Sequence, residues 1–385
     1  MIRNLLRALS GDAPIAAPAR PAPPAPPAPP APPAPPRLSL ARLRQENPGL
    51  ADHFSWGTNA LPPLATPLYL QFGCGERVLD GFVNLDFIPH DARVSMWNML
   101  DLWPDALAGV VDGVFSEDVL EHFFHAEQVY ILCNQNRVLK PEGVARTLMP
   151  SLPKLVDYGA AFKPEAGEIL HTAFGVETGG DALNIGMRFS GHRWLHGPES
   201  LVRMAAMCGF DVIATTCEAS TVDRFNGVNL RDETNSLSFA SDLVKSRSIA
   251  RRLVEPGAIT GAERVEDAGD GAGLYVATAR RPTVTYTLAP GVDASAFACL
   301  NVRSSNLSSF REHNLKSLVI DGIHADSPWH FDETLKSRPC MNVVTRNQLR
   351  LLAAQAPSLS TLVFSPAAQP GEYFTLGCAE IYTLE

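Results

Sequence analysis

The stretch from Leu68 to Asp86, LYLQFGCGERVLDGFVNLD, contains two short apolar runs separated by a turn with Gly73 and Gly75. Glycine at the end of a strand lets a ligand approach the backbone closely, because glycine has no Cβ. A carboxylate at the tip of the next strand, here Asp86, can accept two hydrogen bonds from a ribose diol. The stretch therefore predicts a nucleoside-binding half-sheet. Only eleven positions separate Gly75 from Asp86, so we expect the first crossover helix to be absent or reduced to a turn.

Length and charge narrow the classes of function. With 385 residues, the chain has room for two domains and flexible segments. Its formal net charge of -9 disfavours a nucleic-acid partner, because a polyanion would be repelled. No apolar run approaches the roughly 18 residues that span a membrane, and the N-terminus lacks the features of a secretory signal. We therefore expect no transmembrane segment and a cytoplasmic location.

The seven cysteines are scattered along the chain and show no CxxC spacing. This pattern argues against a zinc site and against a disulfide framework, and it fits a reducing compartment. We therefore expect no metal site.

The N-terminal segment differs from the rest of the chain. Residues 1–12 predict a short amphipathic helix, because Ile2, Leu5, Leu6 and Leu9 recur at helical spacing. Residues 13–36 form a Pro/Ala-rich linker, which favours polyproline II and acts as a semi-rigid spacer. Helix and spacer favour docking on a protein partner or a membrane surface, with a frayed terminus as the alternative.

Residues 37–281 alternate between strand-like and helical patterns. Such alternation indicates an α/β fold with a Rossmann-like, doubly wound, mostly parallel sheet covered on both faces. Residues 151–190 interrupt the alternation and predict an insertion, residues 231–245 are ambiguous, and residues 255–273 resemble a loop. We expect strands at 68–72, 81–86, 94–100, 110–116, 144–149, 210–216 and 274–279, and helices at 126–139 and 198–208.

Residues 282–385 are rich in β-branched and aromatic residues. Strand patterns at 283–288, 315–320, 361–364 and 373–384 predict a separate strand-rich accessory module, with one helix at 346–355. A small sandwich is the expected architecture, and glycan binding, dimerisation and a lid are its alternative roles.

Several motifs stand in a fixed order along residues 68–280. FGCG at 72–75 and GFVNLD at 81–86 are followed by DLWP at 101–104, VDGVFS at 111–116, VLEH at 119–122, RVLKPEG at 137–143 and GHRW at 191–194. Together they resemble the class I S-adenosylmethionine (SAM)-dependent methyltransferases, and most of all the type 11-like branch with a short-loop GCG motif. The resemblance implies SAM as cofactor and methyl transfer as activity.

The resemblance also implies roles for individual residues. Gly73 and Gly75 would lie under the methionine and ribose of the cofactor, and Asp86 would hold the ribose hydroxyls. Asp101 and Leu102 would contact the adenine. The full set of expected cofactor-binding residues is Gln71, Gly73, Cys74, Gly75, Asp86, Asp101, Leu102, Ser116 and Glu117, the last two facing the methionine end.

Each assignment has a structural alternative, and two positions depart from the family pattern. Asp86 could be a solvated turn residue, Asp101 a helix cap and Glu117 a surface carboxylate. Gln71 replaces the acidic residue that often precedes the glycine turn, which removes a carboxylate near the cofactor's ammonium group. Arg77 lies in the loop where many relatives have a third glycine.

A hydroxyl acceptor benefits from a general base, and histidine suits neutral pH. His122 and His192 are the expected catalytic residues, with His125 as a further candidate. Tyr158 and Asp157 in the insertion are weaker candidates. The alternatives are that His122 caps a helix and that His192 packs against Trp194.

The expected reaction is methyl transfer from SAM to a hydroxyl or amine of a small-molecule or carbohydrate acceptor. One alternative is a scaffold with the methyltransferase fold but without catalytic activity. Gln71 favours this alternative, because it replaces the usual acidic residue. A nicotinamide-dependent oxidoreductase is the other alternative, but the missing third glycine and the short first crossover speak against it.

Overall fold

The computed structural model describes residues 39, 42, 59, 60, 62, 64, 66–163, 175–188, 191–230, 237–269, 271–306, 317–324, 343–346, 358–366 and 368–385. The expected N-terminal helix at 1–12 and the linker at 13–36 lie outside these residues. So do all but the first residue of the helix expected at 346–355 and part of the insertion at 151–190.

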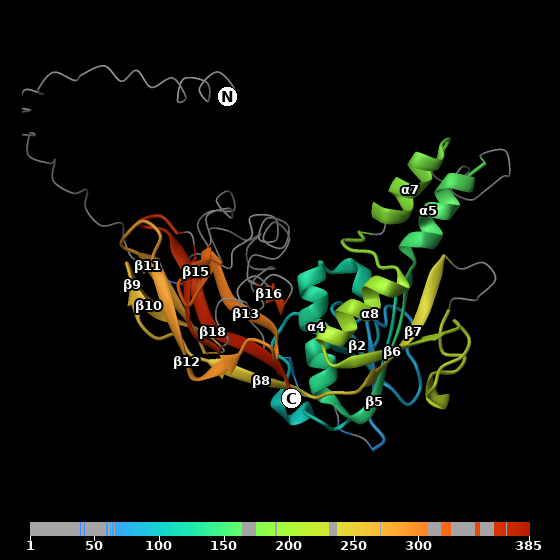
Figure 1. The fold of residues 1–385 in the computed structure, drawn as a ribbon, viewed down its shortest axis with the longest axis horizontal. Helices are drawn as coiled ribbons and strands as arrows, with labels where there is room; N and C mark the ends of the chain where they lie inside the picture. Colours follow the sequence, from blue (N-terminus) through green and yellow to red (C-terminus); the bar gives the residue numbers. More distant parts are fainter. Residues whose placement is uncertain are drawn as a thin grey trace, which may run out of the picture. The chain divides into compact units, whose positions relative to one another are not determined.

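The first half of the chain builds one seven-stranded sheet, in the order β3-β2-β1-β4-β5-β7-β6. Figure 1 labels β2, β5, β6 and β7 of this sheet. The first five strands in that order are parallel, and β7 runs antiparallel to both of its neighbours. The predicted Rossmann-like, doubly wound and mostly parallel sheet is thus confirmed. The ambiguous segment at 231–245 supplies β7. The strands are β1 (Tyr69–Phe72), β2 (Val83–Asp86), β3 (Val94–Met96), β4 (Val111–Glu117), β5 (Leu139–Pro150), β6 (Phe210–Thr215) and β7 (Ser238–Lys245).

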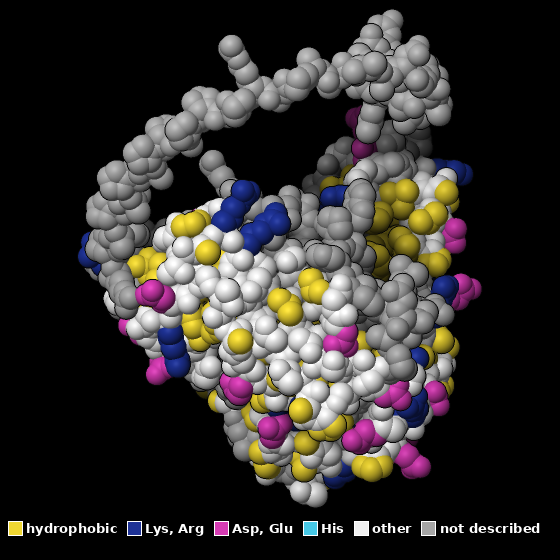
Figure 2. Space-filling model, turned by 60° about the vertical axis from the view of Figure 1, so that its left-hand side comes forward, with side chains coloured by type: hydrophobic (Ala, Val, Ile, Leu, Met, Phe, Trp, Pro, Cys, Tyr) yellow, Lys and Arg dark blue, Asp and Glu magenta, His cyan; other side chains and the backbone are white. Residues whose placement is uncertain are grey.

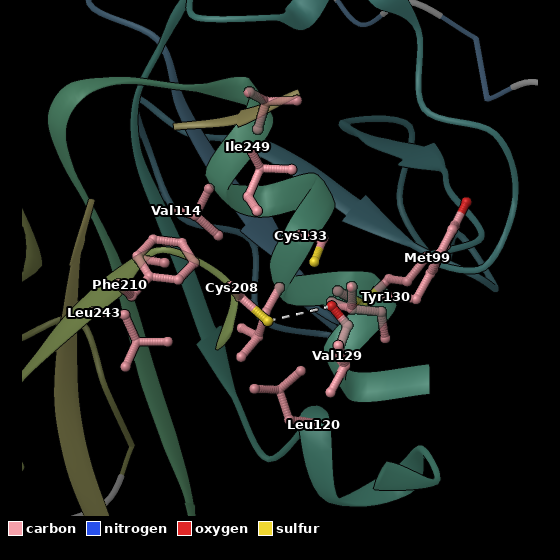
Figure 3. Packing of buried hydrophobic residues seen from close by; sticks show 14 of the residues in the cluster. Met99, Val114, Leu120, Val129, Tyr130, Cys133, Cys208, Phe210, Leu243 and Ile249 are labelled. Atoms are coloured by element: carbon pink, nitrogen blue, oxygen red, sulfur yellow. Dashed lines mark hydrogen bonds between the residues drawn. The ribbon is translucent and has the colours of Figure 1, made fainter. Parts of the chain in front are cut away.

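Helices α4 (His125–Val138) and α8 (Pro198–Met207) pack on one face of this sheet. Figure 3 shows part of this core, where the Cys208 thiol lies 3.6 Å from the carbonyl oxygen of Val129. Nearly all of α4 is buried, polar residues included, because the C-terminal module packs against it as well. A helix buried all round does not show the single apolar stripe of a surface helix.

The opposite face of the sheet is covered by a cluster of aromatic and apolar side chains. Among the described residues, connecting segments rather than long helices cover it. Phe82 and Phe225 pack there against Tyr69 and Phe115, with ring centroids 5.7 to 6.5 Å apart. The sheet is thus covered on both faces, as expected. The direct passage from β1 to β2 through a turn agrees with the short spacing in the sequence.

The described part of the insertion forms a helical hairpin. Its helices α5 (Leu152–Ala161) and α7 (Gly179–Arg188) pack closely, because Gly159 and Gly179 leave no room for a Cβ between them. Short one-turn helices η1 (Asp105–Leu107), η2 (Leu120–His122) and η4 (Asp223–Phe225) lie in the connections. No helix in the described ranges is both long enough and apolar enough to cross a membrane.

The C-terminal module consists of two antiparallel sheets with a shared apolar core. Tyr286 and Phe364 of one sheet and Val302 and Phe374 of the other contribute to that core, which is the expected sandwich arrangement. The strands are β8 (Ile249–Val254), β9 (Ile259–Thr260), β10 (Ala262–Gly269), β11 (Ala272–Ala277), β12 (Thr283–Asp293), β13 (Phe297–Asn306), β14 (Ser317–Ile320), β15 (Ile323–His324), β16 (Val343–Thr345), β17 (Ser358–Ser365) and β18 (Tyr373–Leu384).

Strand pairing moves the expected boundary between the two parts. We expected the module to begin at residue 282, with a loop at 255–273 and a seventh strand of the first sheet at 274–279. Instead β8, β10 and β11 belong to the sheet of β18, and β9 pairs with β12. The strand-rich part therefore begins by Ile249. Charged residues on β8 and β10 mask their strand character, because these strands bury few of their side chains.

A buried polar cluster joins α4 to β13 and β18. The Glu380 carboxylate is fully buried and accepts hydrogen bonds from Arg303 Nε (2.7 Å), Asn301 Nδ2 (3.0 Å), Tyr382 Oη (2.8 Å) and Tyr130 Oη (3.1 Å). Burial alone would raise the pKa of this carboxyl, but the guanidinium groups of Arg303 and Arg251 lower it below its ordinary value. Glu380 is therefore charged at neutral pH and holds the cluster together.

Candidate functional site

Several of the predicted cofactor residues lie at the carboxyl edge of the first sheet, where β1 lies between β2 and β4. Phe72, the last residue of β1, is level with Leu85 on β2 and Ser116 on β4. The next residues along the three strands, Gly73, Asp86 and Glu117, thus lie at one edge. In doubly wound sheets, ligands bind outside the carboxyl ends of the strands at the point where the strand order reverses.

Gly73 and Gly75 both have left-handed backbones, with φ of +61° and +53°. A Cβ on Gly73 would collide with the side chain of Val119, which follows β4. Around the Cβ position of Gly75, by contrast, no described atom lies within 4 Å. The turn thus packs against Val119 at Gly73 and is open at Gly75. The open side leaves room for a ligand over the backbone of Gly75.

The Asp86 carboxylate is fixed at both oxygens. Its Oδ2 accepts a hydrogen bond from the Gly75 N–H (2.8 Å), and its Oδ1 accepts one from the Ile88 N–H (3.0 Å). A carboxylate oxygen can accept more than one hydrogen bond, so both oxygens remain available to a diol. Asp86 therefore holds the glycine turn in place through these two hydrogen bonds.

Two buried side chains border this turn. Gln71 is 4% exposed, and its Oε1 has no hydrogen-bond partner among the described residues. A buried acceptor without a partner costs about 1–3 kcal/mol, which a donor group on a ligand would recover. Burial and the nearby Asp86 raise the pKa of the Cys74 thiol to about 11, so this thiol is neutral at physiological pH.

The tip of β4 is already tied to other segments. Both Glu117 oxygens accept from the Leu230 N–H at 2.9 Å, and Oε2 lies 3.5 Å from Arg77 Nη1. The Arg77 that departs from the family pattern thus pairs with Glu117 across the site. The Ser116 hydroxyl lies 3.4 Å from Thr147 Oγ1, inside the sheet.

Asp101 and Leu102 lie in the connection after β3. Asp101 is buried, and its carbonyl oxygen accepts a hydrogen bond from Tyr130 Oη (3.3 Å). The Leu102 carbonyl accepts one from the Asn59 N–H (3.0 Å). The strand expected at 94–100 ends at Met96, and the residues after it turn back so that Trp97 and Trp103 pack on Phe72.

The two predicted catalytic histidines are brought together. The rings of His122, on η2, and His192 lie 5.2 Å apart, edge to face. Nδ1 of His192 lies 3.0 Å from the Gly186 carbonyl oxygen of α7. Burial and the neighbouring His192 lower the pKa of His122. Seventy positions of sequence separate these residues, yet the fold brings their rings into contact.

Hydrogen bonds from α4 hold the segments next to these histidines, and no sequence pattern indicates them. Gln128 Nε2 donates to the carbonyl oxygens of Leu120 (2.7 Å), Phe123 (3.0 Å) and Trp194 (3.2 Å). The ring of the buried His196 lies between Gln128 Oε1 (2.7 Å) and Ser200 Oγ (2.8 Å). Gln128 and His196 thus fix the segments on either side of the histidine pair.

We expect the stability of the protein to fall by about 1.4 kcal/mol between pH 7.5 and pH 5.5 because of His196 alone. Burial and the charge of His125 lower the pKa of His196 to about 4. The unfolded chain, whose histidine has an ordinary pKa, takes up a proton as the pH falls through 6.5, whereas the folded chain does not. Urea unfolding at both pH values measures the loss, which should shrink in His196→Asn. An equal loss in both proteins would contradict this role.

The other candidates have structural partners. His125 packs against Trp194, with ring centroids 5.2 Å apart, and Tyr158 packs against Phe162 within the insertion. Asp157 is exposed on α5. Among the contacts of the described residues, none joins Tyr158 or Asp157 to His122 or His192.

A cavity of about 530 Å³ lies at the opposite, amino edge of the same sheet. Pro67, Tyr69, Gly81, Phe82 and Arg224 are among its lining residues. It is remote from the carboxyl ends of the strands, so it is not the predicted cofactor site. On the face in Figure 2, the described Lys and Arg side chains are mixed with Asp and Glu and form no continuous basic surface.

Comparisons with known proteins give similarities of fold only. No family model matches the chain, and no curated protein matches it. Among solved structures, a SAM-dependent methyltransferase from Archaeoglobus fulgidus is 14% identical, covers 54% of this chain and 95% of its own, and has a TM-score of 0.28. A variant of a 16S rRNA (adenine(1408)-N(1))-methyltransferase from Catenulisporales acidiphilia is 11% identical. It covers 49% of this chain and 97% of its own, and has a TM-score of 0.27.

A xylan-binding module from Roseburia intestinalis, CBM86, is 8% identical, covers 36% of this chain and 96% of its own, and has a TM-score of 0.23. Similarities this weak do not assign the chain to a family. Its function is therefore inferred from its own residues.

Proposed function

We propose that the chain is a SAM-dependent methyltransferase of the type 11-like branch. The observation that carries this proposal is the carboxyl edge itself, where the open Gly75 turn, the fixed Asp86 carboxylate and the buried Gln71 Oε1 meet. These residues fit the groups of SAM. Asp86 matches the ribose diol, the open Gly75 turn leaves room for the ribose, and Gln71 Oε1 matches the ammonium donor. When bound, SAM supplies an electrophilic methyl group on its sulfonium.

In this proposal Asp86 binds the ribose hydroxyls, and Gln71 Oε1 accepts from the cofactor's ammonium group. Asp101 and Leu102 lie beside the adenine, while Cys74, Ser116 and Glu117 line the methionine end. Because Arg77 holds Glu117, binding at that end requires this ion pair to open or to be shared. The acceptor enters beside His122 and His192, where an imidazole can take its proton.

The proposed acceptor is a hydroxyl or amine of a small molecule or carbohydrate. The formal net charge of -9 and the sandwich module support this class. A role of residues 1–36 in docking on a protein partner, and a cytoplasmic location, are further parts of the proposal. The six described cysteines are free thiols, which suits a reducing compartment.

The test compares two glycines with the same backbone constraint. Gly75 and Gly109 both have positive φ, and neither has a described atom within 4 Å of a Cβ position, but only Gly75 lies at the carboxyl edge. Calorimetry with S-adenosylhomocysteine should show binding to the wild type. We expect Gly75→Ala to weaken it at least tenfold and Gly109→Ala to leave it unchanged. Absence of binding to the folded wild type would overturn the proposal.

An inactive scaffold is the second candidate. The pairing of Glu117 with Arg77 favours it, because this contact occupies the end of the site where the methionine part would lie. A scaffold would bind neither SAM nor its demethylated product, so the same calorimetry separates the two.

A further inference from the structure

Glu121, His122 and His192 bring three metal-ligating side chains together next to the proposed cofactor site. One ligand atom from each residue lies within 4.8 Å of the other two. Glu121 and His122 belong to η2 at the tip of β4, whereas His192 follows the insertion. The Glu121 side chain is fully buried, and the two imidazoles are half-buried. An ion could therefore reach the cluster from the side of the histidines.

The backbone holds the two segments of the cluster in register. The carbonyl oxygen of Glu121 accepts hydrogen bonds from the N–H groups of Arg193 (2.7 Å) and Trp194 (3.2 Å). Gln128 joins the same segments a second time, because its side-chain amide donates hydrogen bonds to the carbonyl oxygens of both Leu120 and Trp194. The position of His192 relative to His122 is thus fixed by main-chain contacts, before any ligand is present.

The His192 ring is also oriented in the manner of a metal ligand. Its Nδ1 is 3.0 Å from the Gly186 carbonyl, so this nitrogen carries the proton and Nε2 keeps its lone pair. Metal-bound histidines commonly donate their second nitrogen to a carbonyl or carboxylate, which fixes the tautomer. The Arg193 guanidinium lies over the Phe124 ring, with 5.5 Å between Cζ and the ring centroid.

The donor set selects the kind of ion. Two imidazole nitrogens and one carboxylate oxygen suit Zn²⁺ and its first-row neighbours, whereas Mg²⁺ prefers oxygen ligands. A tetrahedral Zn²⁺ holds its ligand atoms on the order of 3.3 Å apart, so small side-chain rotations would close the present spacing. Three protein ligands leave a fourth position open for water or a substrate oxygen.

We propose that Glu121, His122 and His192 form a binding site for a Zn²⁺-type divalent ion, facing the acceptor side of the proposed methyltransferase site. This proposal departs from the expectation of no metal site, which rested on the spacing of the cysteines alone. With an ion bound, His122 and His192 act as ligands rather than bases, and an oxygen bound to the ion loses its proton more readily. Metal binding itself does not rest on the proposed function.

The experiment titrates Zn²⁺ into the full, metal-free chain by calorimetry, without SAM. We expect one Zn²⁺ per chain. We also expect at least a 100-fold loss of affinity in Glu121→Gln and in His192→Gln. The matched control is His90→Gln, which removes an exposed histidine and should bind like the wild type. Mg²⁺ in excess should not compete. Equal affinity in all four proteins, no binding, or competition by Mg²⁺ would overturn the proposal.

A second measurement uses the wild type alone, so it does not depend on how the variants fold. X-ray absorption of the Zn²⁺ complex should show nitrogen and oxygen neighbours at about 2.0–2.2 Å. Sulfur at about 2.3 Å would mean that cysteines bind the ion, and the proposed site would be wrong. Because neither measurement contains SAM, their failure and failure of the methyltransferase proposal can be told apart.

Discussion

Replacing Glu380 with glutamine should destabilise the protein by about 3–5 kcal/mol, the largest loss of stability that we expect from one substitution. The change removes a buried negative charge and keeps the side-chain volume. Arg303, which donates to Glu380 at 2.7 Å, then remains charged and buried without its counter-ion. Arg303 cannot lose its proton to avoid this, because the pKa of a guanidinium is too high. Urea unfolding at pH 7.5 measures the difference.

Asp267→Asn is the control for this prediction. Asp267 pairs with Arg264 within the same sheet, but the Asp267 side chain is 84% exposed. Exposed pairs contribute about 0–1 kcal/mol, so this variant should unfold close to the wild type. A loss below about 1 kcal/mol in Glu380→Gln would show that the cluster is not a charged buried network.

Replacing Asp86 with alanine should weaken S-adenosylhomocysteine binding by about 100-fold, equivalent to about 2.7 kcal/mol. The loss has two sources. The variant lacks the acceptor for ribose hydroxyls, and it also lacks the acceptor of the Gly75 and Ile88 N–H groups, so the glycine turn loosens. Asp86→Asn keeps one oxygen acceptor and should lose less. Calorimetry at a temperature where each variant is folded gives the affinities.

Asp80→Ala serves as the matched control. Asp80 is an exposed carboxylate in the same segment between the glycine turn and β2. Its loss removes one negative charge without touching the carboxyl edge, so binding should stay within about twofold of the wild type. If Asp80→Ala and Asp86→Ala weaken binding equally, general charge and not the ribose contact explains the effect.

The sequence predicted most of the first sheet and the site elements on its edge. Apolar runs predicted β1, β2 and β4, and the turn with Gly73 and Gly75 separates the first two. The sequence also singled out Asp86, His122 and His192. In the structure Asp86 accepts a hydrogen bond from Gly75, and the rings of His122 and His192 lie 5.2 Å apart, while the roles of these residues stay predictions.

The remainder depended on contacts between distant residues. No local pattern shows that Arg77 pairs with Glu117, that Gln128 joins Leu120 to Trp194, or that Glu121 lies beside two histidines. The boundary of the module was missed for a similar reason. Arg251 and Arg252 on β8 resemble a polar connection until the long-range pairing with β18 is known.

The pairing of β8 with β18 has a consequence for how the chain is made. β8 ends at Val254, and its partner β18 begins at Tyr373. A ribosome must therefore synthesise the whole intervening stretch before β8 can find its neighbour. Pairings so far apart in sequence form slowly, because a long loop must close first. Until then the side of α4 that faces the module, including Tyr130, is exposed to solvent. We therefore expect chaperones that bind exposed apolar surface to bind the newly made first domain.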